Sequence, residues 1–162
     1  MKNHSAEVDV RVDESCADAV DSGEIGRWAA RTLATVAPNE TAALTVVVTD
    51  DATIRALNRE YLGIDVPTDV LAFSQIEGAA LPDPGPGAGR RYLGDVVVSF
   101  ERAVVQADEY NEPVERELSR LVVHGTLHLL GYEDQHEADR EKMWEVQERI
   151  LSSDQSSVTS DQ

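Results

Sequence analysis

The sequence predicts an α+β fold, built as a small mixed four-stranded sheet flanked by about five helices. Three observations predict this class: β-branched apolar runs that mark strands, amphipathic helical repeats, and the order β-α-β-α-β-loop-β-α-α-α along the chain. The chain has 162 residues, of which 41% are hydrophobic, enough for one buried core. We expect a single domain over residues 1–151 and a disordered Ser-rich tail over residues 152–162.

Four segments predict the strands. Residues 6–13 alternate between valine and charged side chains, which is typical of a half-exposed strand. Residues 43–49 are apolar and β-branched, as in a central strand. Residues 70–73 and 92–99 predict the other two strands, and residues 81–89 between them are too rich in Pro and Gly for anything but a surface loop.

Helical spacing of apolar residues and capping side chains predict the helices. They are expected at residues 24–36, from Asp51 to Tyr61, from Ser99 to Tyr110, from Pro113 to Leu129 and over about residues 137–151. Gly131 is expected to stop the fourth of these helices. Trp28 and Trp144 are expected to be core residues.

The composition excludes several protein classes. No apolar run approaches the roughly 18 residues that span a bilayer, and the N-terminus lacks the apolar stretch of a signal peptide. The single cysteine, Cys16, excludes an internal disulfide framework and fits a reducing compartment. We therefore expect a cytoplasmic protein without a membrane partner.

The net charge is strongly acidic, because 31 acidic residues face 14 basic ones and give −17. A well-solvated acidic surface accounts for this charge, and a salty cytoplasm would favour it further. At low salt such a chain repels polyanions. A nucleic-acid function must therefore depend on local basic residues and a bound cation.

The segment from His124 to His128 carries the clearest chemical signal. Two histidines at i and i+4 lie on one face of a helix and can bind the same metal ion. A bare pair with this spacing is two solvated or hydrogen-bonded histidines about as often as it is a metal site. Here the following turn adds three possible ligands, Glu133, Asp134 and His136. Three ligands and an open position are typical of catalytic zinc, which activates a bound water.

Other hydrolase patterns are absent. A zinc peptidase of the H-E-x-x-H type has its general base directly after the first histidine, where this chain has Gly125. The chain also lacks a G-x-S-x-G elbow, a P-loop and a cysteine placed with a histidine. Glu117, two turns before His124, could hydrogen-bond a ligating histidine, although a solvated glutamate is the favoured interpretation.

Several motifs together resemble one known family. The run His124-Gly-Thr-Leu-His-Leu-Leu-Gly-Tyr132 closely resembles H-G-x-L-H-L-x-G-Y-D-H, the signature of the bacterial YbeY family of rRNA maturation endoribonucleases. Residues 57–73 resemble its L-N-x-x-Y-R-G-K-D-x-P-T-D-V-L-S-F block, and residues 93–99 its L-G-D-I-x-I-S strand. The resemblance covers about residues 44–150 in the same order.

The resemblance implies a YbeY-like fold and a metal-dependent, single-strand-specific endoribonuclease. Family members act in maturation of the 3′ end of the small-subunit 16S rRNA and in ribosome quality control. Their metal, usually assigned as zinc, is held by three histidines. The implied partners are ribosomal RNA, the small ribosomal subunit with its proteins, and the GTPase Era.

The third ligand departs from the family pattern. The family's third histidine lies ten residues after the first, at the position of Asp134 in this chain. We expect one divalent ion on His124, His128 and Asp134, with His136 as the alternative third ligand. Zinc remains the expected ion, and an aspartate ligand makes nickel, iron or manganese plausible as well.

A second departure affects the phosphate contact. The family usually has an arginine after the tyrosine of the long motif, and this chain has Leu62 there. Arg59, on the same predicted helix, is the expected catalytic substitute beside the two histidines, with Arg90 and Arg91 as alternatives. Two competing hypotheses remain. One is a non-catalytic ribosome-assembly or RNA-binding factor with a structural metal, and the other is a metallohydrolase of unknown substrate.

Overall fold

A computed structural model describes residues 7–39, 41–74 and 91–160, with side chains as far as residue 153. The predicted loop at residues 81–89 lies outside the described residues. The strands are β1 (Glu7–Val12), β2 (Ala42–Thr49), β3 (Val70–Ser74) and β4 (Arg91–Ser99). The helices are the 3-10 helix η1 (Glu14–Ala19), α1 (Ser22–Val36), α2 (Asp51–Leu62), α3 (Phe100–Glu109), α4 (Val114–Leu129) and α5 (Glu137–Ser160).

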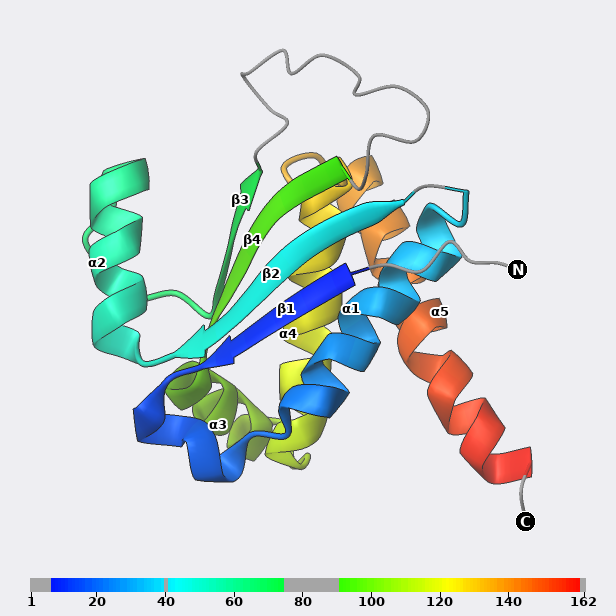
Figure 1. Cartoon of the computed structure of the whole chain (residues 1–162), viewed down its shortest axis with the longest axis horizontal. Helices are drawn as coiled ribbons and strands as arrows, with labels where there is room; N and C mark the ends of the chain where they lie inside the picture. Colours follow the sequence, from blue (N-terminus) through cyan, green and yellow to red (C-terminus); the bar gives the residue numbers. More distant parts are fainter. Residues whose placement is uncertain (1–6, 40, 75–90, 161–162) are drawn as a thin grey trace.

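The four strands form one mixed sheet in the order β1-β2-β4-β3 (Figure 1). β1, β2 and β4 run parallel, while β3 pairs antiparallel with β4 and forms an edge of the sheet. Val46 pairs with Val10 on one side and with Val96 on the other, and Val96 in turn pairs with Ala72. The predicted α+β class with its mixed four-stranded sheet is confirmed.

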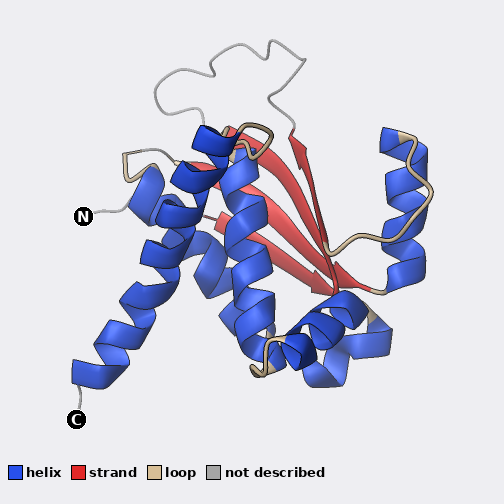
Figure 2. Ribbon diagram, turned by 180° about the vertical axis from the view of Figure 1, so that it is seen from behind, coloured by secondary structure: helices blue, strands red, loops and turns tan. Residues whose placement is uncertain are grey.

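Helices cover the two faces of the sheet unequally (Figure 2). α1 and α4 pack on one face, with α5 outside them, and their apolar side chains form the main core with β2 and β4. α2 lies on the opposite face, where Ile54 packs with Leu71 and Val97 in a smaller cluster. The predicted caps form here as well, since Asp50 accepts from the Thr53 N–H and Ser99 from the Arg102 N–H.

Gly125 lets α4 approach the sheet unusually closely. An ideal Cβ on Gly125 would lie 2.5 Å from Val96 Cγ1 and 3.1 Å from Val70 Cγ2. A side chain there would displace the helix from β3 and β4. The glycine thereby fixes the height above the sheet of the helical turn that carries His124 and His128.

Two predictions about α5 are wrong. The helix extends to Ser160, although its end was expected at about residue 151, because residues 152–160 contain no Gly or Pro to stop it. Trp144 is 60% exposed, whereas Trp28 is buried as expected. α5 contacts the core through Met143, Gln147 and Ile150, and helical geometry leaves Trp144 at the edge of that face.

Two further points concern the limits of the fold. The expected division into a domain over residues 1–151 and a tail stays a prediction. Among the described helices, none combines the length and the apolar character that a bilayer crossing requires.

Candidate metal centre

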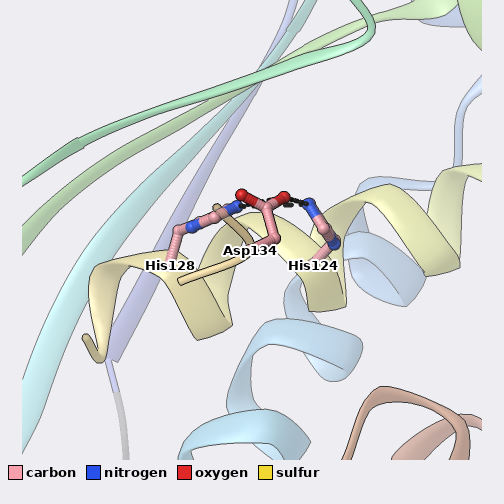
Figure 3. Close-up of side chains that lie close together, drawn as sticks. All are labelled: His124, His128 and Asp134. Atoms are coloured by element: carbon pink, nitrogen blue, oxygen red, sulfur yellow. Dashed lines mark hydrogen bonds and ion pairs between the residues drawn. The ribbon is translucent and has the colours of Figure 1, made fainter. Parts of the chain in front are cut away.

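α4 brings two imidazole rings together on its exposed side (Figure 3). His124 and His128 are one turn apart, and their Nε2 atoms lie 3.2 Å from each other. Both side chains are less than one-third exposed, so protein atoms exclude much of the water around them. The pairing predicted from the i, i+4 spacing is therefore present.

The chain reverses directly after these histidines. Gly131 has a φ of 101°, a conformation that favours glycine, and its N–H donates to the His128 carbonyl. The Tyr132 N–H donates to the Leu127 carbonyl, which completes a Schellman motif. Gly131 thus ends the helix as predicted, and the turn it makes leads back toward the two rings.

Asp134 completes a group of three possible ligands. Its Oδ2 atom lies 3.6 Å from His124 Nε2 and 3.5 Å from His128 Nε2. Ligand atoms on a tetrahedral ion at about 2.0–2.1 Å lie about 3.3–3.4 Å from one another. The three atoms therefore have the spacing of one face of a tetrahedral site, and the group could hold a metal ion.

The hydrogen bonds of the rings orient their lone pairs. His128 Nδ1 lies 3.0 Å from the Tyr132 carbonyl, and His124 Nδ1 lies 2.9 Å from Gln147 Oε1. Both partners are carbonyl-type oxygens that only accept, so each Nδ1 carries the hydrogen. Each neutral ring then offers its Nε2 lone pair to the same point as the Asp134 carboxylate.

Three lone pairs that converge in this way require a positive charge between them. Burial lowers the pKa of the His124 imidazole, against a smaller opposing effect of its hydrogen bond to Gln147. A proton on this ring is therefore disfavoured at neutral pH. The chemistry of the donor set fits a divalent cation, and the Nδ1 partners supply the outer hydrogen bonds that metal-binding histidines use.

A cleft of about 400 Å³ opens beside the metal centre. It lies between β3 and the turn that follows α4, and its lining includes two of the three candidate ligands, His128 and Asp134. Its lining residues are Leu62, Val70, Leu71, Ala72, Ser74, His128, Leu129, Gly131, Tyr132, Glu133, Asp134 and Gln135. Leu62 therefore lies in the cleft wall, at the position where the family usually has an arginine.

Neither of the two described arginines that the sequence suggested for the phosphate contact lines this cleft. Arg59 is 60% exposed on α2, with Nη1 3.8 Å from Asp65 Oδ1, and it is not among the residues lining the cleft. Its catalytic role stays a prediction. Arg91 is exposed at the start of β4, and Arg90 lies outside the described residues.

Two other residues considered from sequence, His136 and Glu117, do not contribute to the group of three. His136 is exposed just before α5 and does not join the group of three. Glu117 is 2% exposed and forms an ion pair with Arg120, so the favoured expectation of a solvated glutamate is wrong. Glu117 accepts from Arg120, whereas the His124 ring bonds to Gln147, so among the described residues Glu117 is not the partner of that ring.

Sequence reasoning missed two residues that support the centre. Gln147 was not assigned to the centre from sequence; it lies on the apolar face of its helix, where a buried amide needs a partner, and this signal could have indicated that it binds a polar group. Arg140 Nη1 donates to the Asp134 carbonyl at 3.1 Å and so ties α5 to the turn. No local pattern indicates that contact.

Comparisons with known proteins agree with this arrangement. The sequence profile of the family described as endoribonuclease YbeY matches residues 11–155. Endoribonuclease YbeY of Roseiflexus castenholzii is 43% identical over 145 residues, which are 89% of this chain and 90% of that protein. Endoribonuclease YbeY of Desulfitobacterium hafniense is 48% identical over 117 residues, or 72% and 74% of the two chains.

A solved structure agrees at the level of the fold. The solution structure of a Thermotoga maritima protein matches with a TM-score of 0.58 at 23% identity, over 95% of this chain and 93% of that one. The profile match includes α4, the turn after it and all of β2, β3 and β4. Since the matched range contains three whole strands of the sheet and the candidate metal centre, the chain belongs to the YbeY family of endoribonucleases.

Proposed function

We propose that the chain is a metal-dependent endoribonuclease specific for single-stranded RNA, acting in rRNA maturation and ribosome quality control. One observation carries the proposal: His124, His128 and Asp134 direct three ligand atoms to one point beside an open cleft. The curated relatives are named endoribonucleases, which supports RNA as the substrate. The expected position of cleavage is the 3′ end of the small-subunit 16S rRNA.

The proposed site holds one divalent ion, with zinc as the expected metal and nickel, iron or manganese as alternatives. A bound ion of this kind supplies a Lewis acid and lowers the pKa of a bound water. His124 and His128 hold their Nε2 atoms in place through their Nδ1 hydrogen bonds, and Asp134 contributes a negative charge. A single strand can bring its backbone to one metal ion without duplex geometry, which supports single-strand specificity.

The proposed partners follow from family membership. They are ribosomal RNA, the small ribosomal subunit with its proteins, and the GTPase Era. A cytoplasmic location follows from the same proposal, because ribosome maturation takes place there.

A non-catalytic assembly factor is the second candidate. Leu62 lies in the cleft wall where the family usually has an arginine, and no arginine is found among the described residues that line this cleft. Such a cleft has less positive charge for stabilising a cleaved phosphate. In this case the ion would contribute to folding and RNA binding alone.

The test compares His128→Ala and Asp134→Ala with His136→Ala, a matched variant outside the group of three. We expect about one metal ion per chain in the wild type, lost in the first two variants and kept in the third. Cleavage of an end-labelled single-stranded RNA is expected to follow the metal content. Loss of metal in His136→Ala alone would contradict the assigned third ligand.

Circular dichroism of each variant separates loss of chemistry from loss of fold. A folded, metal-loaded wild type that leaves single-stranded RNA intact would contradict the nuclease proposal. Normal rRNA processing in cells that carry a folded His124→Ala variant would favour the assembly factor.

A further inference from the structure

A second hollow adjoins the metal centre on the side of α5. Its volume is about 160 Å³, and its lining residues are His124, Asp134, Arg140, Met143, Trp144 and Gln147. The first cleft contains His128 and Asp134, whereas this hollow contains His124 and Asp134. The three ligand atoms therefore lie between two concave surfaces, of which the proposed cleavage uses only one.

One face of α5 supplies four of the six residues that line the hollow. Arg140, Trp144 and Gln147 lie at i, i+4 and i+7, which places them in a row along the helix. Met143 and Gln147 are buried and form the inner end of the hollow. Trp144 is 60% exposed and lies at its mouth, although an indole gains more from burial than almost any other side chain.

Arg140 supplies a positive charge at the same place. One of its guanidinium nitrogens donates to the Asp134 carbonyl at 3.1 Å, which holds the side chain beside the metal centre. Within the described residues, no carboxylate forms an ion pair with Arg140. By contrast, Arg55 and Arg59 both pair with Asp65, so part of their charge is already compensated.

We propose that Arg140 and Trp144 form a nucleotide subsite beside the metal centre, in which Trp144 stacks on a nucleobase and Arg140 binds an adjoining phosphate. An aromatic platform next to a cation is the usual means of holding single-stranded nucleic acid, and it tolerates any base. The inference rests on the proposed function. Arg140 adds a cation beside the metal centre, in a different hollow from the cleft that Leu62 lines.

Tryptophan fluorescence tests the stacking directly. The chain has two tryptophans, the exposed Trp144 and the buried Trp28. A short 2′-O-methylated oligonucleotide is expected to quench the wild-type emission. Trp144→Phe is expected to lose this quenching, with Trp28 as its remaining indole, while it keeps most of its affinity because phenylalanine also stacks.

Fluorescence anisotropy of an end-labelled oligonucleotide measures its binding. It separates the contribution of the base from that of the phosphate. Trp144→Ala is expected to weaken binding about five- to hundred-fold. An abasic oligonucleotide of equal length is expected to bind Trp144→Ala as well as it binds the wild type. Arg140→Gln is expected to weaken binding of both oligonucleotides. Tyr110→Ala, which removes an equally exposed aromatic ring on another element, serves as the control.

Two results would overturn the subsite: wild-type affinity in Trp144→Ala, or emission that RNA leaves unchanged in the wild type. Metal content is measured for every variant. It is expected to stay at the wild-type value in the Trp144 and Tyr110 variants, and Arg140→Gln, which loses a contact to the Asp134 carbonyl, is compared with the wild type at full metal loading. Failure of the nuclease proposal looks different. In that case the metal-loaded wild type leaves RNA intact, whereas the quenching and the loss of affinity in Trp144→Ala persist.

Discussion

At the metal centre, the hydrogen bond from His124 Nδ1 to Gln147 determines which ring nitrogen faces a metal ion. Gln147→Leu removes the acceptor while keeping the volume and burial of the side chain. We expect metal affinity to fall about 10- to 100-fold, as for other outer partners of ligating histidines. Competition with a chromogenic chelator measures this change.

The matched control is Gln147→Glu, which retains an acceptor oxygen for the ring. It is expected to hold the metal at least as well as the wild type. A metal affinity of Gln147→Leu equal to that of the wild type would show that the helix alone orients His124.

The buried Glu117 predicts a pH dependence of stability. Burial raises the pKa of its carboxyl from the ordinary 4.5, against the opposing effect of the Arg120 guanidinium. A raised folded-state pKa contributes stability below the unfolded-state value, and this stability is lost as pH rises through the folded-state value. Glu117→Gln does not titrate, so we expect it to gain stability relative to the wild type as pH rises from about 5 to about 8.

Urea unfolding of both proteins at the two pH values measures this difference. The exposed Glu115→Gln variant controls for the removal of one negative charge from the same helix. A Glu117→Gln variant whose relative stability falls with rising pH would mean that the Arg120 ion pair outweighs burial.

The sequence predicts the three candidate ligands and fails for the residues around them, for one physical reason. His124, His128 and Asp134 lie on a single helix and the turn after it, so local spacing is enough to bring them together. The positions of Gln147 and Trp144 depend on how α5 packs against α4. An amide on an apolar helix face indicates that Gln147 needs a partner, but no local pattern says which one. Both residues show the same helical periodicity, yet one lies inside the packed face and the other at its edge.

Among the elements, α4 depends most on its distance from the sheet. Gly125→Ala places a methyl group within 2.5 Å of Val96 Cγ1, so the helix or the strand must move. We expect a loss of about 1–3 kcal/mol in the free energy of unfolding. Metal affinity is expected to fall as well, because the neighbouring His124 moves with the helix. Urea denaturation and metal titration measure the two effects.

The matched control is Gly26→Ala in α1. Its added Cβ would lie 3.4 Å from Val10 Cγ2, an ordinary contact. Alanine is the better helix former there, so this variant is expected to gain up to about 1 kcal/mol. Equal stability changes in the two variants would contradict the close packing of α4.

The strands and helices were largely predictable because each carries its own periodicity and caps. Their order in the sheet was not, since β4 lies between β2 and β3 and that arrangement depends on long-range pairing. The extension of α5 was missed because a polar segment without Gly or Pro is compatible with both a tail and a helix.

For the whole molecule, the net charge of −17 opposes the approach of RNA, while the proposed contacts are few and local. The affinity of a single strand falls with salt at a slope of about −0.7 for each phosphate neutralised by a side chain. Arg140 and at most one further cation at the site then give a logarithmic slope of about −0.7 to −1.4. A basic nuclease with about six phosphate contacts would give about −4.

Anisotropy titrations of one oligonucleotide over ionic strengths of about 0.05–0.2 M measure this slope. Arg140→Gln is expected to reduce its magnitude by about 0.7, because one neutralised phosphate is lost. A wild-type slope near −4 would require a basic surface that the described residues do not supply at the metal centre. A shallow wild-type slope that stays the same in Arg140→Gln would place the phosphate contact at the metal ion alone. A bound cation can offset the repulsion without any arginine.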